Sequence, residues 1–156
     1  MGIRAKFTIK DINDGINLAI EEVWDSIVEV LNYVGLEAVK TARDEHERNY
    51  TDQTGNLRAS IGYVIAFDGN VINEYGFDPN AAKTTKKKRD GITGASEGRQ
   101  AAFDAIKGSK GYILSVTAGM EYGGEVEKRQ YNVLTFTAAQ AEETARQMLQ
   151  QYFVLA

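Results

Sequence analysis

The sequence predicts an α+β fold: a long N-terminal helix and a C-terminal helix packed on one face of a mainly antiparallel sheet of about four to five strands. Apolar residues repeat at helical spacing near both ends of the chain, and strand-like runs joined by short turn sequences fill the middle. No regular strand–helix–strand repeat occurs, which argues against a parallel sheet. The 156 residues, 43% hydrophobic and 26% charged, suit a single globular domain spanning 1–156.

The first predicted element is the long helix. Asp14 is its expected N-cap, because an aspartate accepts hydrogen bonds from the free N–H groups of a first turn. Residues 1–13 are then expected to form an arm or edge strand, and the helix to run to about Arg48. Gly35 is expected to bend or split it. The apolar face follows steps of three and four, at Ile16, Ile20, Val23, Ile27, Leu31 and Val34.

The sheet is predicted from the middle of the chain. A strand beginning at Ile61 alternates large and small residues, and Asp68-Gly69 is typical of a tight hairpin turn. The return strand is expected from Val71 to about Gly76. Further strands are expected at 111–118, 122–127 and 131–135.

Two helices and one loop complete the expected order. Residues 77–95 are polar, basic and glycine-containing, and predict a mobile surface loop within the domain. A short helix is expected over 96–107, and the final helix to start at a capping box, Thr137 to Gln140. With the terminal helices on one face of the sheet, the other face is expected to meet solvent or a partner.

Charge is distributed unevenly along the chain. The net charge is −4, yet the segment 83–89 holds five of the 18 basic residues and no acid, so the remainder carries −9. An acidic body disfavours non-specific DNA binding, which requires neutralised phosphates. The basic segment is the candidate interface, with its charges on Lys83, Lys86, Lys87, Lys88 and Arg89.

The composition also excludes several chemistries. Without cysteine there is no thiol nucleophile, disulfide or thiolate-bound zinc, and a single histidine excludes any site that needs two imidazoles from one chain. No run approaches the roughly 18 apolar residues of a membrane span, and residues 1–11 show no apolar signal core. We therefore expect no membrane insertion and no Sec export.

Three weaker motifs admit a chemical interpretation. Glu125 and Glu127 would share one face of a strand and predict a carboxylate-dependent hydrolase, although exposed strand charges are the commoner explanation. His46 beside acids is a general base only as a minor alternative to a solvated helix end. The glycines of segment 91–98 match no phosphate-binding spacing.

Two stretches resemble a known family. The segment Thr54-Gly55-x-Leu57-Arg58-x-Ser60-Ile61 after a long helix is similar to the T-G-x-L-R-x-S-I signature of bacteriophage tail-component proteins, the head–tail joining or tail-completion proteins of long-tailed phages. The segment Ala118-Gly119-Met120-x-Tyr122-x-Gly124-x-Val126-Glu127 resembles the family's second block. Tyr50 to Gln53 replace the family's frequent proline, and Lys128 to Gln130 replace a Gly-Thr.

The resemblance implies a non-enzymatic structural protein of a phage or prophage virion, assembled as a homo-oligomeric ring. Its partners would be other copies of itself and neighbouring connector or tail proteins, with no cofactor, metal or small-molecule substrate. In physical terms Leu57 is expected to anchor a chain corner in the core, and Arg58 to pair with an acid on the helix or a neighbouring copy. A nucleic-acid-binding module that uses the basic segment remains a second alternative to the hydrolase.

Overall fold

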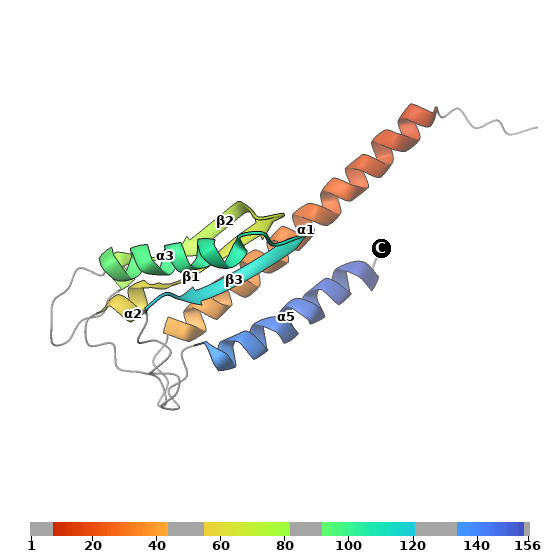
Figure 1. Ribbon diagram of the computed structural model, residues 1–156. Helices are drawn as coiled ribbons and strands as arrows, with labels where there is room; N and C mark the ends of the chain where they lie inside the picture. The colour runs from red at the N-terminus through yellow and green to blue at the C-terminus, as the bar shows by residue number, and fades with distance from the viewer. Residues whose placement is uncertain (1–7, 44–54, 82–91, 121–133, 155–156) are drawn as a thin grey trace, which may run out of the picture.

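The structure, a computed structural model, describes residues 8–43, 55–81, 92–120 and 134–154. The elements are α1 (Ile9–Arg43), α2 (Asn56–Ala59), β1 (Ile61–Phe67), β2 (Asn70–Gly76), a 3-10 turn η1 (Pro79–Ala81), α3 (Ile92–Ile106), β3 (Tyr112–Ala118) and α5 (Thr135–Val154). Figure 1 shows α1 as much the longest element, running past the sheet. The predicted α+β class with a long N-terminal helix is confirmed.

The sheet has three strands within the described residues, in the order β2-β1-β3, with β1 antiparallel to both neighbours. The prediction of four to five strands counted 122–127 and 131–135. Residues 121–133 lie outside the described part, and Thr135 is the first residue of α5. The predicted hairpin is confirmed: Asp68 and Gly69 both have positive φ, 49° and 77°, as a two-residue type I′ turn requires.

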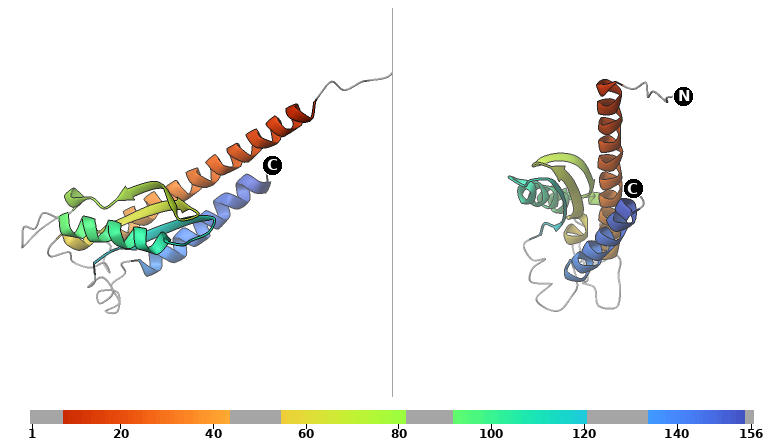
Figure 2. Two further views of the ribbon diagram at one scale, coloured as in Figure 1. Left: turned by 45° about the horizontal axis from the view of Figure 1, so that its top comes forward. Right: turned by 90° about the vertical axis from the view of Figure 1, so that its right-hand side faces the viewer.

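The sheet is covered on both faces. Tyr63 and Ile65 of β1 pack with Val39 and Ala42 of α1, whereas the intervening Val64 packs with α3. Because successive strand residues point to opposite faces, β1 is buried on both sides. The expectation that one face meets solvent or a partner is wrong, since α3 occupies it (Figure 2).

Helix α1 begins earlier than predicted, so the expected arm over 1–13 is wrong from Ile9 onward. Thr8 caps the helix in place of Asp14. The Thr8 N–H and hydroxyl donate to the Asp11 carboxylate at 2.7 and 2.8 Å, and the Asp11 N–H donates back to the hydroxyl oxygen at 3.2 Å. These hydrogen bonds, the backbone one first, lower the pKa of Asp11. The helix continues through Gly35, where a side chain would strike the ring of Tyr63.

The predicted loop 77–95 is shorter than expected. Pro79–Ala81 form η1, and α3 begins at Ile92, not at residue 96. Gly94 of the predicted loop lies inside α3, as does Gly98 one turn further on. Their missing side chains let the helix backbone approach the backbone of Asn56 at Gly94 and of Ser60 at Gly98. A glycine that serves close packing is indistinguishable in sequence from one that serves a turn.

Helix α5 packs along α1 on the side of the sheet opposite α3 (Figures 1 and 2). It begins at Thr135, two residues before the predicted cap, and Thr137 is buried. Its inward residues Ala141, Met148 and Leu149 are only half-buried. The contact between α1 and α5 therefore buries its side chains less completely than the core around the sheet does.

Candidate assembly surfaces

The family-like motif forms a buried corner between α1 and the sheet. Gly55 has φ 80°, a left-handed conformation that suits glycine, and α2 follows it directly. Leu57 is 1% exposed and belongs to the core cluster that joins α1 to β1. The expectation that Leu57 anchors this corner is confirmed.

Hydrogen bonds close the corner at the start of β1. The Ser60 hydroxyl donates to the Leu57 carbonyl oxygen at 2.8 Å. The Ile61 carbonyl oxygen accepts from the Phe77 N–H at 3.1 Å and from the Arg43 guanidinium at 2.7 Å. Arg43 thereby ties the end of α1 to the first strand, so the motif residues described are architectural.

The first half of α1 projects from the body, and we call residues 9–25 the stem. Every residue of the stem is exposed, and at 1.5 Å per residue it is about 25 Å long. Figures 1 and 2 show it extending beyond the sheet. Trp24 lies where the stem leaves the body, with its ring centroid 6.4 Å from that of Phe67. Within the described part of the chain, the stem meets the body only at this end.

The stem is amphipathic, with its two faces of opposite chemistry. At 100° per residue, five aliphatic residues fall on one face, and five acids fall on the other. The aliphatic stripe is Ile9, Ile12, Ile16, Ile20 and Val23, all exposed. The acidic face carries Asp11, Asp14, Glu21, Glu22 and Asp25; with Lys10 the stem has a net charge of −4.

The same helix face continues into the body, where α5 covers it. Val34 and Ala38 lie further along the helix and line a cleft of about 460 Å³ against Ala141 and Thr144 of α5. The same apolar face of α1 is therefore covered by α5 at the body and exposed to solvent along the stem.

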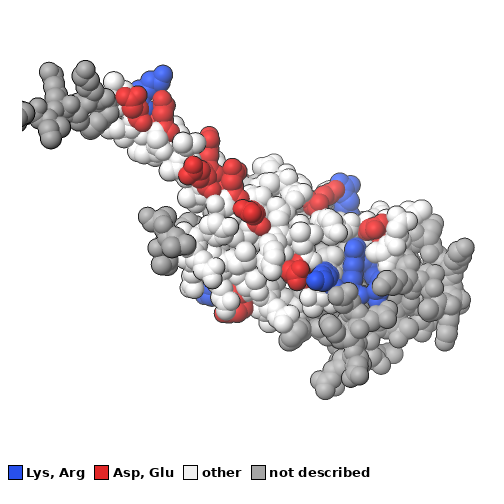
Figure 3. Space-filling model, turned by 180° about the vertical axis from the view of Figure 1, so that it is seen from behind, with Lys and Arg blue, Asp and Glu red and all other residues white. Residues whose placement is uncertain are grey.

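A second surface carries positive charge at the other end of α1. Lys40, Arg43 and Arg58 line a cleft of about 410 Å³ between α1 and β2, together with the exposed Leu36 and Tyr75 and one acid, Glu37. Arg58 is 4% exposed, so its whole side chain is enclosed, and the exposed Lys40 presents the positive charge of the cleft most openly. Figure 3 shows acidic side chains along the stem, with basic ones near its tip, and basic and acidic side chains side by side on the body.

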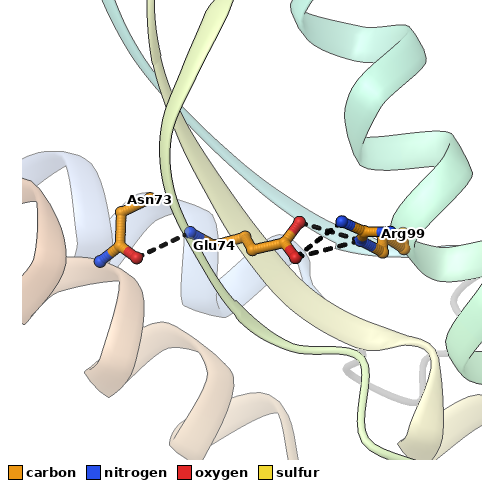
Figure 4. Close-up of polar contacts among 3 residues, drawn as sticks. All are labelled: Asn73, Glu74 and Arg99. Atoms are coloured by element: carbon orange, nitrogen blue, oxygen red, sulfur yellow. Dashed lines mark hydrogen bonds and ion pairs between the residues drawn. The ribbon is translucent and has the colours of Figure 1, made fainter.

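The edge strand β2 is tied to the helices on both faces of the sheet. The Asn73 amide donates to Asn32 Oδ1 of α1 at 2.6 Å, and the Tyr63 hydroxyl donates to the same oxygen at 3.1 Å. The neighbouring Glu74 accepts from Arg99 Nε of α3 at 2.9 and 3.1 Å (Figure 4). The hydrogen bond and the charge of Glu74 raise the pKa of Arg99, and burial raises the pKa of Tyr63.

Several predicted site residues lie outside the described part of the chain. They comprise one residue of the first motif, the second block from residue 121 onward, the hydrolase and general-base candidates, and the basic interface: Thr54, Tyr122, Val126, Glu127, Glu125, His46, Lys83, Lys86, Lys87, Lys88 and Arg89. The predictions for them stay predictions. The described residues hold no cluster of three potential metal ligands, and none of their helices is long and apolar enough to cross a membrane.

Sequence reasoning missed the stem and the cationic cleft. The sequence pattern places the stem residues in an arm or on a helix face, and it does not show that this face is exposed. The cleft is lined by residues of α1, α2 and β2, which are far apart in the sequence.

Comparison of the chain with protein-family models, with curated protein sequences and with solved structures found no match.

Proposed function

We propose that this chain is a non-enzymatic structural protein of a phage or prophage virion, assembling as a homo-oligomeric ring at the head–tail junction or the tail end. The observation that carries the proposal is the separation of charge along α1, acidic at the stem and cationic at the cleft beside Lys40. A closed ring of identical copies is built from head-to-tail contacts, and each contact joins two different, complementary patches.

The ring contact we propose places the acidic face of one stem against the cationic cleft of the next copy. Leu18 projects from the middle of the acidic face, where an apolar group can meet the exposed Leu36 and Tyr75 of the cleft. Opposite charges at such a contact steer association and fix its register more than they add affinity. The contact should therefore weaken as salt concentration rises.

The motif residues support the same proposal. Leu57, Ser60 and Ile61 are buried in the corner between α1 and the sheet, as expected of a motif with an architectural role. The basic residues at 83–89 add positive charge that would contact a neighbouring copy, an adjoining connector ring or DNA in the channel. The phage origin itself rests on the resemblance of the motif.

Light scattering over a wide concentration range, with electron microscopy of any large species, tests the proposal. A defined ring of about six or more copies is expected, and it should dissociate at high salt. The variant Lys40→Glu should weaken the ring, whereas Lys107→Glu should not. The two lysines are matched, with side chains 67% and 71% exposed and each paired to an acid three residues earlier.

Equal effects of the two lysine variants would contradict the cleft as the contact. Assembly into an open, irregular aggregate at every salt concentration would contradict the ring.

A further inference from the structure

The cleft between α1 and α5 has a floor of small side chains and a polar rim. Its rim is exposed and includes Glu37 of α1 and Glu143 of α5. Its volume of about 460 Å³ is within the range of small-ligand sites. The floor is buried or half-buried and consists of Val34, Ala38, Thr41, Thr137, Ala141 and Thr144.

The charged groups that line this cleft are of one sign. Each helix contributes one carboxylate, and no Lys, Arg or His is among the described residues that line it. Lys40 lies 3.8 Å from Glu37, but both side chains are at least half exposed, and such a pair is weak. Glu143 accepts a hydrogen bond at 2.6 Å from the amide of Gln147, which is neutral. A ligand that enters the cleft therefore meets a negative potential.

Thr137 provides a second observation that is independent of charge. It is 2% exposed, and its hydroxyl oxygen has no hydrogen-bond partner among the described residues. A buried hydroxyl without a partner costs free energy, and such groups in native proteins are usually satisfied by water or a ligand. Thr137 lies on the cleft floor, in the first turn of α5. A hydrogen-bond donor bound in the cleft would satisfy it.

We propose that this cleft binds a primary ammonium group on a short alkyl chain, supplied either by a lysine side chain of a partner protein or by a free aliphatic diamine. An ammonium group has a positive charge and three donors but no acceptor, which complements two carboxylates and a hydroxyl oxygen. The alkyl chain packs on Val34, Ala38 and Ala141 of the floor. Tyr33, half exposed and one turn from Glu37, offers its ring face to the cation.

Other ligand classes suit the cleft less well. A phosphate or carboxylate would meet two acids and no cation among the described lining residues. A wholly apolar ligand would leave the Thr137 hydroxyl without a partner. A metal ion would need further ligands, and the described residues hold no group of three Asp, Glu, His or Cys side chains that could bind one.

The ammonium site is separate from the proposed ring contact, which uses the cleft beside Lys40. Glu37 lines both clefts. Glu143 and Thr137 line the α1–α5 cleft and not the other, so variants of these two residues test the ammonium site alone.

Calorimetric titration of the whole chain tests the site with two probes, cadaverine, which is a linear diamine, and N-acetyl-lysine methylamide. Saturable binding is expected, with a dissociation constant below about 1 mM that rises with salt concentration. The uncharged diol of the same chain length as cadaverine should not bind. Tighter binding of the lysine derivative would identify a protein side chain as the source, and tighter binding of cadaverine a free diamine.

Glu143→Gln should weaken binding about tenfold, because a charge-assisted hydrogen bond is lost. Glu142→Gln is the matched control and should change the affinity less than about twofold. The two acids are adjacent and exposed, and each accepts a hydrogen bond from the side chain four residues later, but Glu142 does not line the cleft.

Thr137→Val replaces the hydroxyl by a methyl group of similar size. The free chain should keep its melting temperature, because the hydroxyl has no partner to lose in the described residues. Binding of cadaverine should nevertheless weaken about fivefold, and the rise in melting temperature that cadaverine causes should shrink accordingly.

Three outcomes would overturn the ammonium site. They are no binding of either ammonium probe, equal binding of the diol, and equal losses of affinity in the Glu142→Gln and Glu143→Gln chains. A stable Thr137→Val chain with unchanged affinity would show that the ligand does not reach the floor, and the proposal would then fail as well. Each of these results would leave the proposed ring standing.

Discussion

The packing of α3 against the chain corner yields a quantitative prediction about Gly98. A Cβ added there would lie 2.7 Å from the carbonyl carbon and 2.8 Å from Cα of Ser60, and closer still to its oxygen. Ordinary van der Waals contact begins near 3.4 Å, and backbone atoms cannot rotate away as a side chain can. Gly119 also packs closely on α3, since a Cβ added at Gly119 would strike the backbone of Gly98.

Gly98→Ala should therefore destabilise the protein. Inserting a methyl group into a packed site costs about 1–3 kcal/mol, and the rigid backbone places this site near the upper end. Alanine recovers about 0.5–1 kcal/mol of helix propensity, so the net loss should be about 2 kcal/mol. For a chain of this size that corresponds to a fall in Tm of roughly 4–8 °C.

Urea unfolding followed by circular dichroism measures the loss. Gly15→Ala is the control, because nothing lies within 4 Å of a Cβ added at Gly15. The control should leave the free energy of unfolding unchanged or raise it by up to about 1 kcal/mol. Both variants must be measured at one low protein concentration, since any association raises apparent stability. If Gly98→Ala proves as stable as Gly15→Ala, the close approach of α3 to Ser60 is wrong.

Three smaller predictions concern single interactions. Leu57→Ala should cost about 2–5 kcal/mol in urea unfolding, because the side chain is fully enclosed; a loss under about 1 kcal/mol would contradict its role as the corner anchor. Glu74→Gln should cost at most about 1 kcal/mol despite its contacts with Arg99, since both side chains are at least about one-third exposed. The lowered pKa of Asp11 means that its ionised form favours the folded cap, so the cap is complete above pH 3.8 and is lost as pH falls through the lower folded value. Amide exchange at residues 9–13 should then increase at low pH in the natural chain, and Asp11→Asn should remove that dependence.

The elements with strong local signals were predictable from the sequence. β1, the Asp68-Gly69 turn and the core of α1 all combine a clear period with suitable end residues. The predicted start of α1 was wrong because the sequence offers two possible N-caps, Thr8 and Asp14, six residues apart. From sequence alone, an isolated aspartate is as good a cap as a threonine followed three residues later by Asp11.

The long-range features were not predictable from local patterns. The coverage of the second sheet face depends on α3, whose glycines suggested a loop, and the close packing that explains them involves residues nearly forty positions away. The exposure of the stem could not be predicted for a different reason. An exposed aliphatic stripe has the same spacing as a buried one, so periodicity identifies the helix and its apolar face, but the coverage of that face depends on the rest of the fold.

The central position of β1 bears on how the chain reaches its fold. β1 pairs with β2 through a two-residue turn, but its other neighbour, β3, follows only after α3. During synthesis the hairpin is therefore complete while one edge of its most apolar strand, from Ile61 to Phe67, still lacks a partner. Such an edge is a template for wrong pairing between nascent chains. The slow, aggregation-sensitive step of folding should be the arrival of β3, with the distant β1–β3 register setting its rate.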